Sequence, residues 1–419
     1  MIKMKKLMSA LLALSVVLSA AAFSSCGNKS EKTSESVSIT ESKSSPIQRS
    51  KEPSMEEVDV SVDSDTPKIT QNKLGDLNQR ISVSQAVPSF KCRSEKLEAR
   101  EIAKDTTVAL ISENSTNSFH SYLNSNLKRG AERVGFKEVK IAETDGSASS
   151  INDALAKAVE DKVDLIILSG DINKDPVSSG IEYAQANGIE VYSSGSVSVG
   201  LPDHYVDYTV PVNYGLAGEL MADWGIVKTS GKIHALAVSC TDSSLSPAIF
   251  KGFKAEFEKH VSSEEGSCTS INTTSIEIGN GLANKIKNAI TNDPKINYIF
   301  VFDDGAINDA ISATVQAGVD VKIVATGGSI EDMDFAQSGS IEMLVAHSYE
   351  WTAYGIIDYV LRAVGGMELP AEQDVPFRVL TKDNMKKAMD DYSGGYDGFH
   401  EIAFGNAFIT GYNELWGYY

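Results

Sequence analysis

From Thr106 to the C-terminus, short apolar runs alternate with longer amphipathic stretches almost without interruption. The run Val108–Ile111 is continuously apolar, as expected for a strand that is covered on both faces of a parallel sheet. Between Phe119 and Val134, apolar residues recur three or four positions apart and form one stripe on a helix. Repeated alternation of this kind predicts an α/β fold built from doubly wound parallel sheets. The predicted strands are Val108–Ser112, Val139–Glu143, Val163–Ser169, Ile189–Ser193, Lys232–Ser239, Thr269–Thr274, Tyr298–Phe302, Val321–Ala325 and Ile341–Ala346.

One break in the alternation indicates that the chain forms two lobes. Nine strands are more than a typical single sheet holds. The segment 205–213 follows a predicted strand without an intervening helix, and Pro211 fixes its backbone. We therefore predict an extended crossover into a second lobe at this segment.

A polar loop, residues 112–118, follows the first predicted strand. It is too polar to be part of a core, and it lies at the carboxyl end of its strand. Open α/β sheets bind ligands at that end, where loops and helix N-termini converge. The sequence therefore predicts that this loop contributes to a binding site.

The N-terminus has the pattern of an export signal. A basic start, an apolar run over residues 7–23 and small residues after it are typical of a secretory signal peptide, residues 1–25, and too short for a stable membrane span. Phe23-Ser24-Ser25-Cys26 resembles a bacterial lipobox, so Cys26 is the expected lipidated N-terminus, with an incidental cysteine as the alternative. Residues 26–104 are predicted to be a Ser-, Thr- and Glu-rich disordered tether, with a transient helix around 97–103.

The composition excludes several classes of function. Lys and Arg total 38 against 57 for Asp and Glu, a net charge of −19 that argues against a nucleic-acid partner. The sequence has no phosphate-binding loop, HExxH, CxxC or GxSxG motif, and its six histidines show no metal-ligand spacing. We therefore predict no catalytic residues, no metal and no cofactor. Three cysteines remain beside Cys26, and we expect no structural disulfide among Cys92, Cys240 and Cys268.

The strand, loop and helix at residues 108–136 resemble the opening of the type 1 periplasmic sugar-binding proteins, the ribose-, galactose- and autoinducer-binding group. The similarity rests on Asn117-Ser118-Phe119, on Gly135-Phe136, and near the C-terminus on Gly411-Tyr412 and Leu415-Trp416-Gly417. It implies two doubly wound parallel-sheet lobes joined by a hinge of three crossings, at 205–213, 346–348 and 377–381. The N-terminal lobe would comprise 105–209 and 348–378, and the C-terminal lobe 210–347 and 379–419.

The resemblance also implies which residues contact a ligand. Ser194 stands where sugar binders usually have an Asp-Arg pair, Gly327 replaces an expected Asp, and His347 replaces a Gln, so the usual charged sugar clamp is largely missing. Phe119 has core packing as an alternative role, Asn117 has N-capping, and His347 has a buried polar position in the core. The candidate ligand-binding residues are Glu113, Asn117, Phe119, His120, Ser194, Asp242, Asp303, Gly327 and His347.

Four neighbouring positions carry further expectations. Asp304 precedes a helix and is expected to cap it, whereas Asp303 is expected to point into the cleft. Tyr349 and Trp351 could supply an aromatic lid, although Trp351 could equally pack in the core.

Taken together, the resemblance implies an exported, lipid-anchored solute-binding protein on the extracytoplasmic face of the membrane. It would capture a small polar solute, a sugar above all, between its lobes for an ABC permease, and act as a monomer. A nucleoside-binding lipoprotein of the same fold is the first alternative. A ligand-sensing module for a membrane signalling partner is the second, and an enzyme ranks last.

Overall fold

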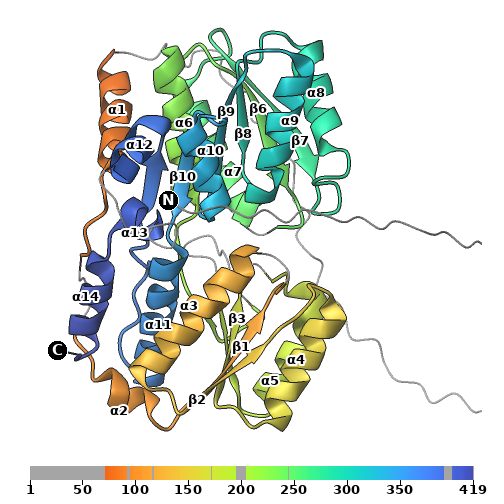
Figure 1. The fold of residues 1–419 in the computed structure, drawn as a ribbon. Coiled ribbons are helices and arrows are strands. Elements are labelled where there is room, and N and C mark those ends of the chain that lie inside the picture. Colours follow the sequence, from red (N-terminus) through yellow and green to blue (C-terminus); the bar gives the residue numbers. More distant parts are fainter. Residues whose placement is uncertain are drawn as a thin grey trace, which may run out of the picture. The chain divides into compact units, whose positions relative to one another are not determined.

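Two separate β-sheets organise the chain (Figure 1). The computed structural model describes residues 71–91, 95–115, 118–170, 172–194, 204–243, 245–390 and 399–418, without the side chains of 71–72, 118–119, 387–390 and 399. The predicted signal peptide, Cys26 and the tether up to residue 70 lie outside the described residues. Within the described part, no helix is both long and apolar enough to span a membrane.

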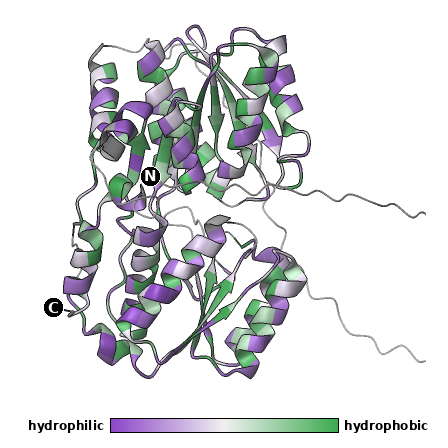
Figure 2. Cartoon of the chain, viewed as in Figure 1, coloured by the Kyte–Doolittle hydropathy of each residue, from purple (hydrophilic) through white to green (hydrophobic). Residues whose placement is uncertain are grey.

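The first sheet has five parallel strands in the order β2-β1-β3-β4-β5. Alternate residues of β1 face opposite sides, so Leu110 packs towards helices α3 and α11, and Ile111 packs towards α4 and α5. Figure 2 shows that the central strands are hydrophobic, and helices cover both faces for that reason. The elements are β1 Thr107–Ser112, α3 Ser118–Val134, β2 Glu138–Ala142, α4 Ala148–Glu160, β3 Leu165–Ser169, η1 Asp175–Val177, α5 Ser178–Ala186, β4 Glu190–Ser193, β5 Tyr208–Thr209 and α11 Tyr349–Val364.

The second sheet has six strands in the order β11-β10-β9-β8-β6-β7, and only β11 is antiparallel to its neighbour. Helices α6 and α7 cover one face of this sheet, and α8, α9 and α10 cover the other. The elements are α6 Gly215–Thr229, β6 His234–Cys240, α7 Leu245–His260, β7 Ser267–Thr273, α8 Leu282–Asn292, β8 Tyr298–Val301, η2 Asp304–Ala306, α9 Ile307–Ala317, β9 Lys322–Gly327, α10 Ile330–Ser338, β10 Met343–His347, β11 Phe377–Leu380, α12 Lys382–Asp390 and α13 Phe399–Phe404.

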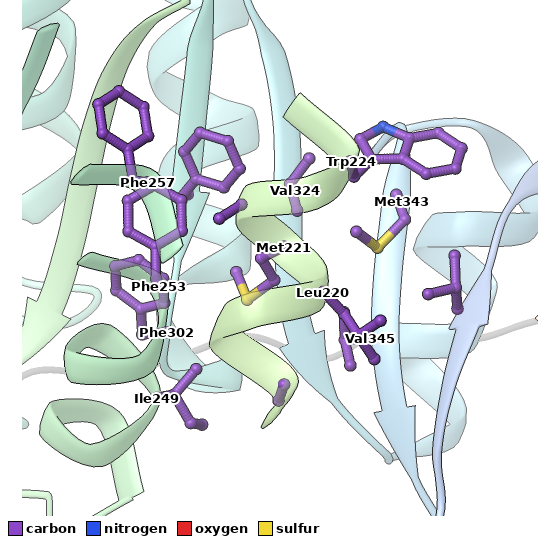
Figure 3. Close-up of a cluster of buried hydrophobic side chains, with 14 of the residues drawn as sticks. Leu220, Met221, Trp224, Ile249, Phe253, Phe257, Phe302, Val324, Met343 and Val345 are labelled. Atoms are coloured by element: carbon purple, nitrogen blue, oxygen red, sulfur yellow. The ribbon is translucent and has the colours of Figure 1, made fainter. Parts of the chain in front are cut away.

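Figure 3 shows part of the apolar core that lies between helices α6 and α7 and the second sheet. Met221 of α6 and Phe253 of α7 point towards the sheet, where Val324 of β9 and Val345 of β10 meet them. Phe253 also packs on Phe300, with ring centroids 4.5 Å apart. Burying side chains of this size stabilises the fold by about 1.5–3 kcal/mol each.

All nine predicted strands are present, and their ends differ from the predicted ends by a few residues at most. Two strands were not predicted. β5 has two residues, too few to show a period. β11 lies where a hinge crossing was predicted, and its buried Arg378, which donates to the carbonyl of Gln85, interrupts the apolar pattern of a strand.

The predicted tether, 26–104, extends too far into the chain. Helix α1, Gln71–Gln85, packs on α6, and helix α2, Ala99–Ala103, lies within the core of the first sheet. Leu77 and Ile81 are four residues apart, so they lie on one face of α1, and both are buried in the core of the second sheet. A helix was predicted around 97–103 only as a transient one, whereas α2 packs with Ala99 and Ala103 in the core.

The C-terminal tail also differs from its predicted lobe. Residues 379–419 were assigned to the second lobe, but helix α14, Ala407–Leu415, packs on α11 and belongs to the core of the first sheet. Phe408 stacks on Trp351 at 4.7 Å, and Trp416 stacks on Tyr354 at 5.3 Å. The aromatic content of the tail therefore serves this packing.

The two described cysteines lie at opposite ends of neighbouring strands. Cys240 ends β6 and is buried, whereas Cys268 lies near the start of β7 and is exposed, and both are free thiols. β6 and β7 are parallel, and Cys268 is paired in register with Ala235. Cys92 lies outside the described residues.

Candidate functional site

A cavity of about 470 Å³ opens among the loops that follow the carboxyl ends of strands from both sheets. Its volume lies within the range of small-molecule sites, about 300–1,000 Å³. Most of the predicted site residues that the structure describes line it. The lining residues are Glu113, Asn114, His120, Asp145, Gly146, Cys240, Asp242, Ser243, Leu245, Ile249, Ser275, Ile278, Phe302, Asp303, Asp304, Gly305, Thr326, Gly327, His347 and Tyr349. We refer to this cavity as the cleft pocket.

Glu113 and His120 form a pair on the side of the first sheet. Glu113 directly follows β1, and its backbone N–H donates to Ser169 at the end of β3, at 2.9 Å. His120, in the first turn of α3, places its Nε2 3.1 Å from Oε2 of Glu113. Gly170 makes room for this pair, since a Cβ at its position would lie 3.0–3.1 Å from both side chains. Its φ of +104° also favours glycine.

Asp145 lies in the loop after β2 and is held by donors of the following helix. Its Oδ1 accepts hydrogen bonds from Ser147 N–H at 2.9 Å and Ser150 Oγ at 2.6 Å. These hydrogen bonds, from Ser150 first, lower the pKa of Asp145 to about 2. The carboxylate is therefore ionised at neutral pH and has a fixed orientation.

Asp242 follows β6 and joins it to the loop after β7. Its carboxylate accepts from Ser275 Oγ at 2.7 Å, from Ser275 N–H at 2.9 Å, and from Cys240 Sγ at 3.0 Å. Burial raises the pKa of Asp242, but the hydrogen bonds from Cys240 and Ser275 outweigh it, so the pKa lies below its usual value. Asp242 is thus a charged pocket residue whose position is set by its neighbours.

Asp303 and Asp304 follow β8, and both line the cleft pocket. Asp303, and not Asp304 as expected, is the N-cap of η2, where it accepts from Gly305 N–H at 3.2 Å. Burial raises the pKa of Asp303, helped by the charges of Asp242 and Glu113. Burial, followed by the charges of Asp332 and Asp303, raises the pKa of Asp304 well above its usual value.

Gly327 ends β9, and the carboxylate of Asp332 occupies the space beside it where a side chain would lie. A Cβ at Gly327 would overlap Oδ2 of Asp332 in helix α10. That oxygen accepts from Gly328 N–H at 3.0 Å and Ser329 N–H at 2.9 Å, and Ser329 caps the helix in return. Position 327 therefore carries a glycine in place of the expected Asp, but the carboxylate of Asp332 lies beside it.

His347 and Tyr349 line the pocket where the chain leaves β10 for α11. His347 is buried and packs edge-on to the rings of Tyr214, at 5.6 Å, and Tyr349, at 4.8 Å. Burial lowers the pKa of His347 to about 3, so the imidazole is neutral at neutral pH. His347 is therefore a buried residue that also lines the pocket, and its ligand role stays a prediction.

Other predicted contacts are not brought to the pocket. Ser194 is buried, and its Oγ accepts from Gly170 N–H at 3.1 Å and donates to Leu168 O at 3.2 Å. The predicted ligand role of Ser194 is therefore replaced by a structural one. Trp351 is core rather than lid, whereas Asn117 and the side chain of Phe119 lie outside the described residues.

Several pocket residues were not among the predicted contacts: Asp145, Gly146, Leu245, Ser275, Ile278, Phe302 and Gly305. Asp145 could have been found, because it lies just after the second predicted strand, where the same carboxyl-end rule applies. Leu245 and Ile249 read as core positions of a helix in the sequence, and only the structure shows that they reach the pocket.

A larger cavity, about 1060 Å³, lies at the other end of the second sheet. It is lined by Lys322 and Glu342, at the amino ends of β9 and β10, and by Trp224 and Lys228 of α6. Parallel sheets bind ligands at their carboxyl ends, so we assign the functional site to the cleft pocket. Among the described residues, no group of three or more His, Cys, Asp or Glu side chains is placed to hold a metal ion.

Comparisons with known proteins agree with this fold. A periplasmic binding protein domain matches residues 108–368. Among curated proteins, none matches the chain by sequence. An ABC transporter solute-binding protein from Agrobacterium vitis, bound with α-D-tagatopyranose, is 18% identical, covers 69% of this chain and 100% of its own, and has a TM-score of 0.58.

Two further solved structures are similar to the same degree. A solute-binding protein from Actinobacillus succinogenes with bound D-allose is 18% identical and covers 68% of this chain and 100% of its own, with a TM-score of 0.57. A glucose-galactose binding protein from Geobacillus stearothermophilus is 17% identical and covers 67% and 98%, with a TM-score of 0.57. The predicted α/β fold of periplasmic binding type I is confirmed.

Proposed function

The chain belongs to the periplasmic binding protein family, and we propose that it is an extracytoplasmic lipoprotein that captures a small polar solute, a sugar above all, for an ABC transporter. The observation that supports this proposal is the cleft pocket, which is lined by residues that follow the strands of both sheets. A solute that contacts both sheets favours the state in which they are close together. The protein binds and releases its solute unchanged, since its family is one of binding proteins.

The lining of the cleft pocket suits a hydroxylated solute. Carboxylates accept hydrogen bonds from hydroxyl groups, and Ser243, Ser275 and Thr326 add hydroxyls that both donate and accept. Phe302 and Tyr349 offer ring faces that can cover the C–H surface of a sugar ring. The same two rings favour one alternative, a nucleoside, whose base would stack on an aromatic side chain.

A thermal-shift panel tests the proposed function. The chain without its signal peptide, carrying Cys26→Ser, would be melted with monosaccharides, disaccharides, polyols, nucleosides and amino acids. A bound solute at a hundredfold excess over its Kd adds about 2.7 kcal/mol of stability, so we expect a rise in Tm with a sugar. A rise with nucleosides alone would favour the alternative, and no rise across the panel would contradict solute binding.

A pair of variants makes the panel specific to the cleft pocket. Glu113→Ala removes a pocket carboxylate, whereas Glu264→Ala removes an exposed one in the turn before β7. We expect Glu113→Ala to reduce the ligand-induced rise in Tm and Glu264→Ala to leave it unchanged. Equal effects of both variants would place the binding elsewhere.

The lipid anchor and the partner are part of the proposal. We expect the protein made with its own signal sequence to fractionate with membranes, and Cys26→Ser to release it. Membrane retention of the Cys26→Ser protein would contradict the anchor. An adjacent permease and ATPase gene would support transport, whereas an adjacent histidine kinase gene would support a sensing role for the same pocket.

A further inference from the structure

The described residues that line the cleft pocket carry charge of one sign. None of them is Lys or Arg. The carboxylates come from loops of both sheets: Glu113, Asp145, Asp242, Asp303 and Asp304.

Two of these carboxylates are oriented by neutral donors that leave their charge in place. Asp145 is held by Ser147 and Ser150, and Asp242 is held mainly by Ser275. Hydroxyl and backbone N–H donors favour the ionised form of a carboxyl group without neutralising it. A solute in the pocket therefore meets at least this fixed negative charge.

Asp303 and Asp304 are adjacent in the sequence, and both line the cleft pocket. The charged groups that act on Asp303 are the carboxylates of Asp242 and Glu113, and those that act on Asp304 are Asp332 and Asp303. Burial is the first cause of the raised pKa of both carboxyls, and the charges of these acidic neighbours add to it, while hydrogen bonds from Gly305 and Ser243 lower the pKa of Asp303. Asp303 and Asp304 are half-buried in the pocket, and like charges partly removed from water are costly unless a proton or a cation compensates them. The pocket without solute therefore favours protons on this pair.

We propose that the solute is a cation, a small hydroxylated amine of the amino-sugar type, whose ammonium group is held by Asp303 and Asp304. This inference rests on the solute-binding function proposed above. An ammonium group has three N–H donors and no acceptor, which matches two neighbouring carboxylates. Tyr349 lines the same pocket and offers a ring to a cation.

The remaining pocket groups suit the neutral part of such a solute. Glu113 and His120 lie on the side of the first sheet, and Ser243 and Thr326 lie on the side of the second. They can accept from or donate to hydroxyl groups. The ammonium group of the solute would thus bind at the second sheet, and its hydroxyl groups would bind at both sheets.

A neutral sugar could use the same acceptors but would leave the like charges uncompensated when water is excluded. Hydrogen bonds to charged groups are about twice as strong as neutral ones. We therefore expect an amine to bind about tenfold more tightly, or better, than its neutral analogue. This advantage should shrink at high salt, because salt screens charge interactions.

Titration calorimetry on matched solutes tests the inference on the unmodified pocket. The probes are D-glucosamine and D-galactosamine, each beside its parent sugar and its N-acetyl derivative, which keeps the nitrogen but removes the charge. We expect one amine to bind at least about tenfold more tightly than both neutral analogues. Its binding should also release protons at mildly acidic pH, because an ammonium group displaces protons from Asp303 and Asp304.

Two isosteric variants locate the effect. Asp303→Asn and Asp304→Asn remove one charge each at nearly constant volume, whereas Glu264→Gln removes an exposed charge outside the pocket. We expect each Asn variant to lose the preference for the amine, and Glu264→Gln to keep it. Removing a like-charge repulsion should not prevent folding, and the wild-type comparison decides the question even if a variant does not fold.

The outcomes separate the two proposals. If a neutral sugar binds as tightly as its amine, or if the amine's advantage survives in both Asn variants, the charge inference is wrong and solute binding stands. If none of these sugars and no solute of the thermal-shift panel binds, the proposed function fails and the inference fails with it.

Discussion

Arg80 of α1 holds the buried carboxylate of Asp223 on α6 through two hydrogen bonds of 2.5 Å each. The same guanidinium donates to Glu256 of α7 at 2.6 Å, and His260 lies 3.0 Å from that carboxylate. These contacts join a helix from the predicted tether to the second sheet. Because the side chain of Asp223 is fully buried, its charge depends on Arg80 for compensation.

Replacing Arg80 by Met should therefore destabilise the protein strongly. Removing one partner of a buried pair leaves an uncompensated charge, which typically costs about 3–5 kcal/mol. Urea denaturation would measure the loss in unfolding free energy. The matched control is Lys128→Met, which breaks an exposed pair with Glu132 and should cost less than about 1 kcal/mol. Equal losses in the two variants would show that the Arg80 cluster contributes no more than a surface pair.

Two buried histidines should make stability fall in mild acid. Burial lowers the pKa of His347 to about 3 and of His400 to about 4, from 6.5. Below pH 6.5 the unfolded chain binds protons at these groups while the folded chain does not, so stability is complete above pH 6.5 and is lost as the pH falls towards 4. Each histidine should contribute on the order of 3 kcal/mol to this loss.

Urea denaturation across this pH range would measure the slope. His400 stacks between Tyr122 and Phe404, with centroids at 5.3 and 6.1 Å, so His400→Phe keeps a ring there and removes the titration. We expect a flatter pH dependence in His400→Phe and no change in His204→Phe, which alters an exposed histidine. An unchanged slope in His400→Phe would contradict the assignment.

The strands could be predicted because they are apolar on both faces, a signal that depends only on neighbouring residues. Helix α1 could not be assigned in the same way, since its position depends on partners such as Asp223 that are 143 residues away from Arg80 in the sequence. The tail was misplaced for a similar reason. Its aromatic residues predict packing, but nothing local indicates that Phe408 meets Trp351.

The site shows the same limit. Residues directly after strands, such as Glu113, Asp242 and Asp303, could be predicted because topology brings the carboxyl ends of parallel strands together. Ser194 satisfies the same rule but uses its hydroxyl on the backbone of the neighbouring strand. A sequence does not show whether such a hydroxyl binds a solute or the backbone of the neighbouring strand.

Ser194→Ala should therefore lower stability without changing solute affinity. The loss of two buried hydrogen bonds, to Gly170 and Leu168, should cost about 1–3 kcal/mol. Glu113→Gln is the opposite case, because it changes a pocket carboxylate while keeping its size. We expect weaker solute binding in Glu113→Gln and unchanged binding in Ser194→Ala, as measured by calorimetry. A large loss of affinity in Ser194→Ala would restore its predicted ligand role.

Gly170→Ala should disturb the pocket through the pair that lies against it. A Cβ there would lie 3.0 Å from His120 and 3.1 Å from Glu113, at a φ of +104°. Gly188 provides the control, since it also has a positive φ, +77°, but a Cβ there meets nothing within 4 Å. Both alanine variants should lose about 1–3 kcal/mol of stability from backbone strain. Only Gly170→Ala should also weaken solute binding, because Glu113 and His120 must move to make room. If the two variants bind solute equally well, the Glu113–His120 pair does not contact the solute.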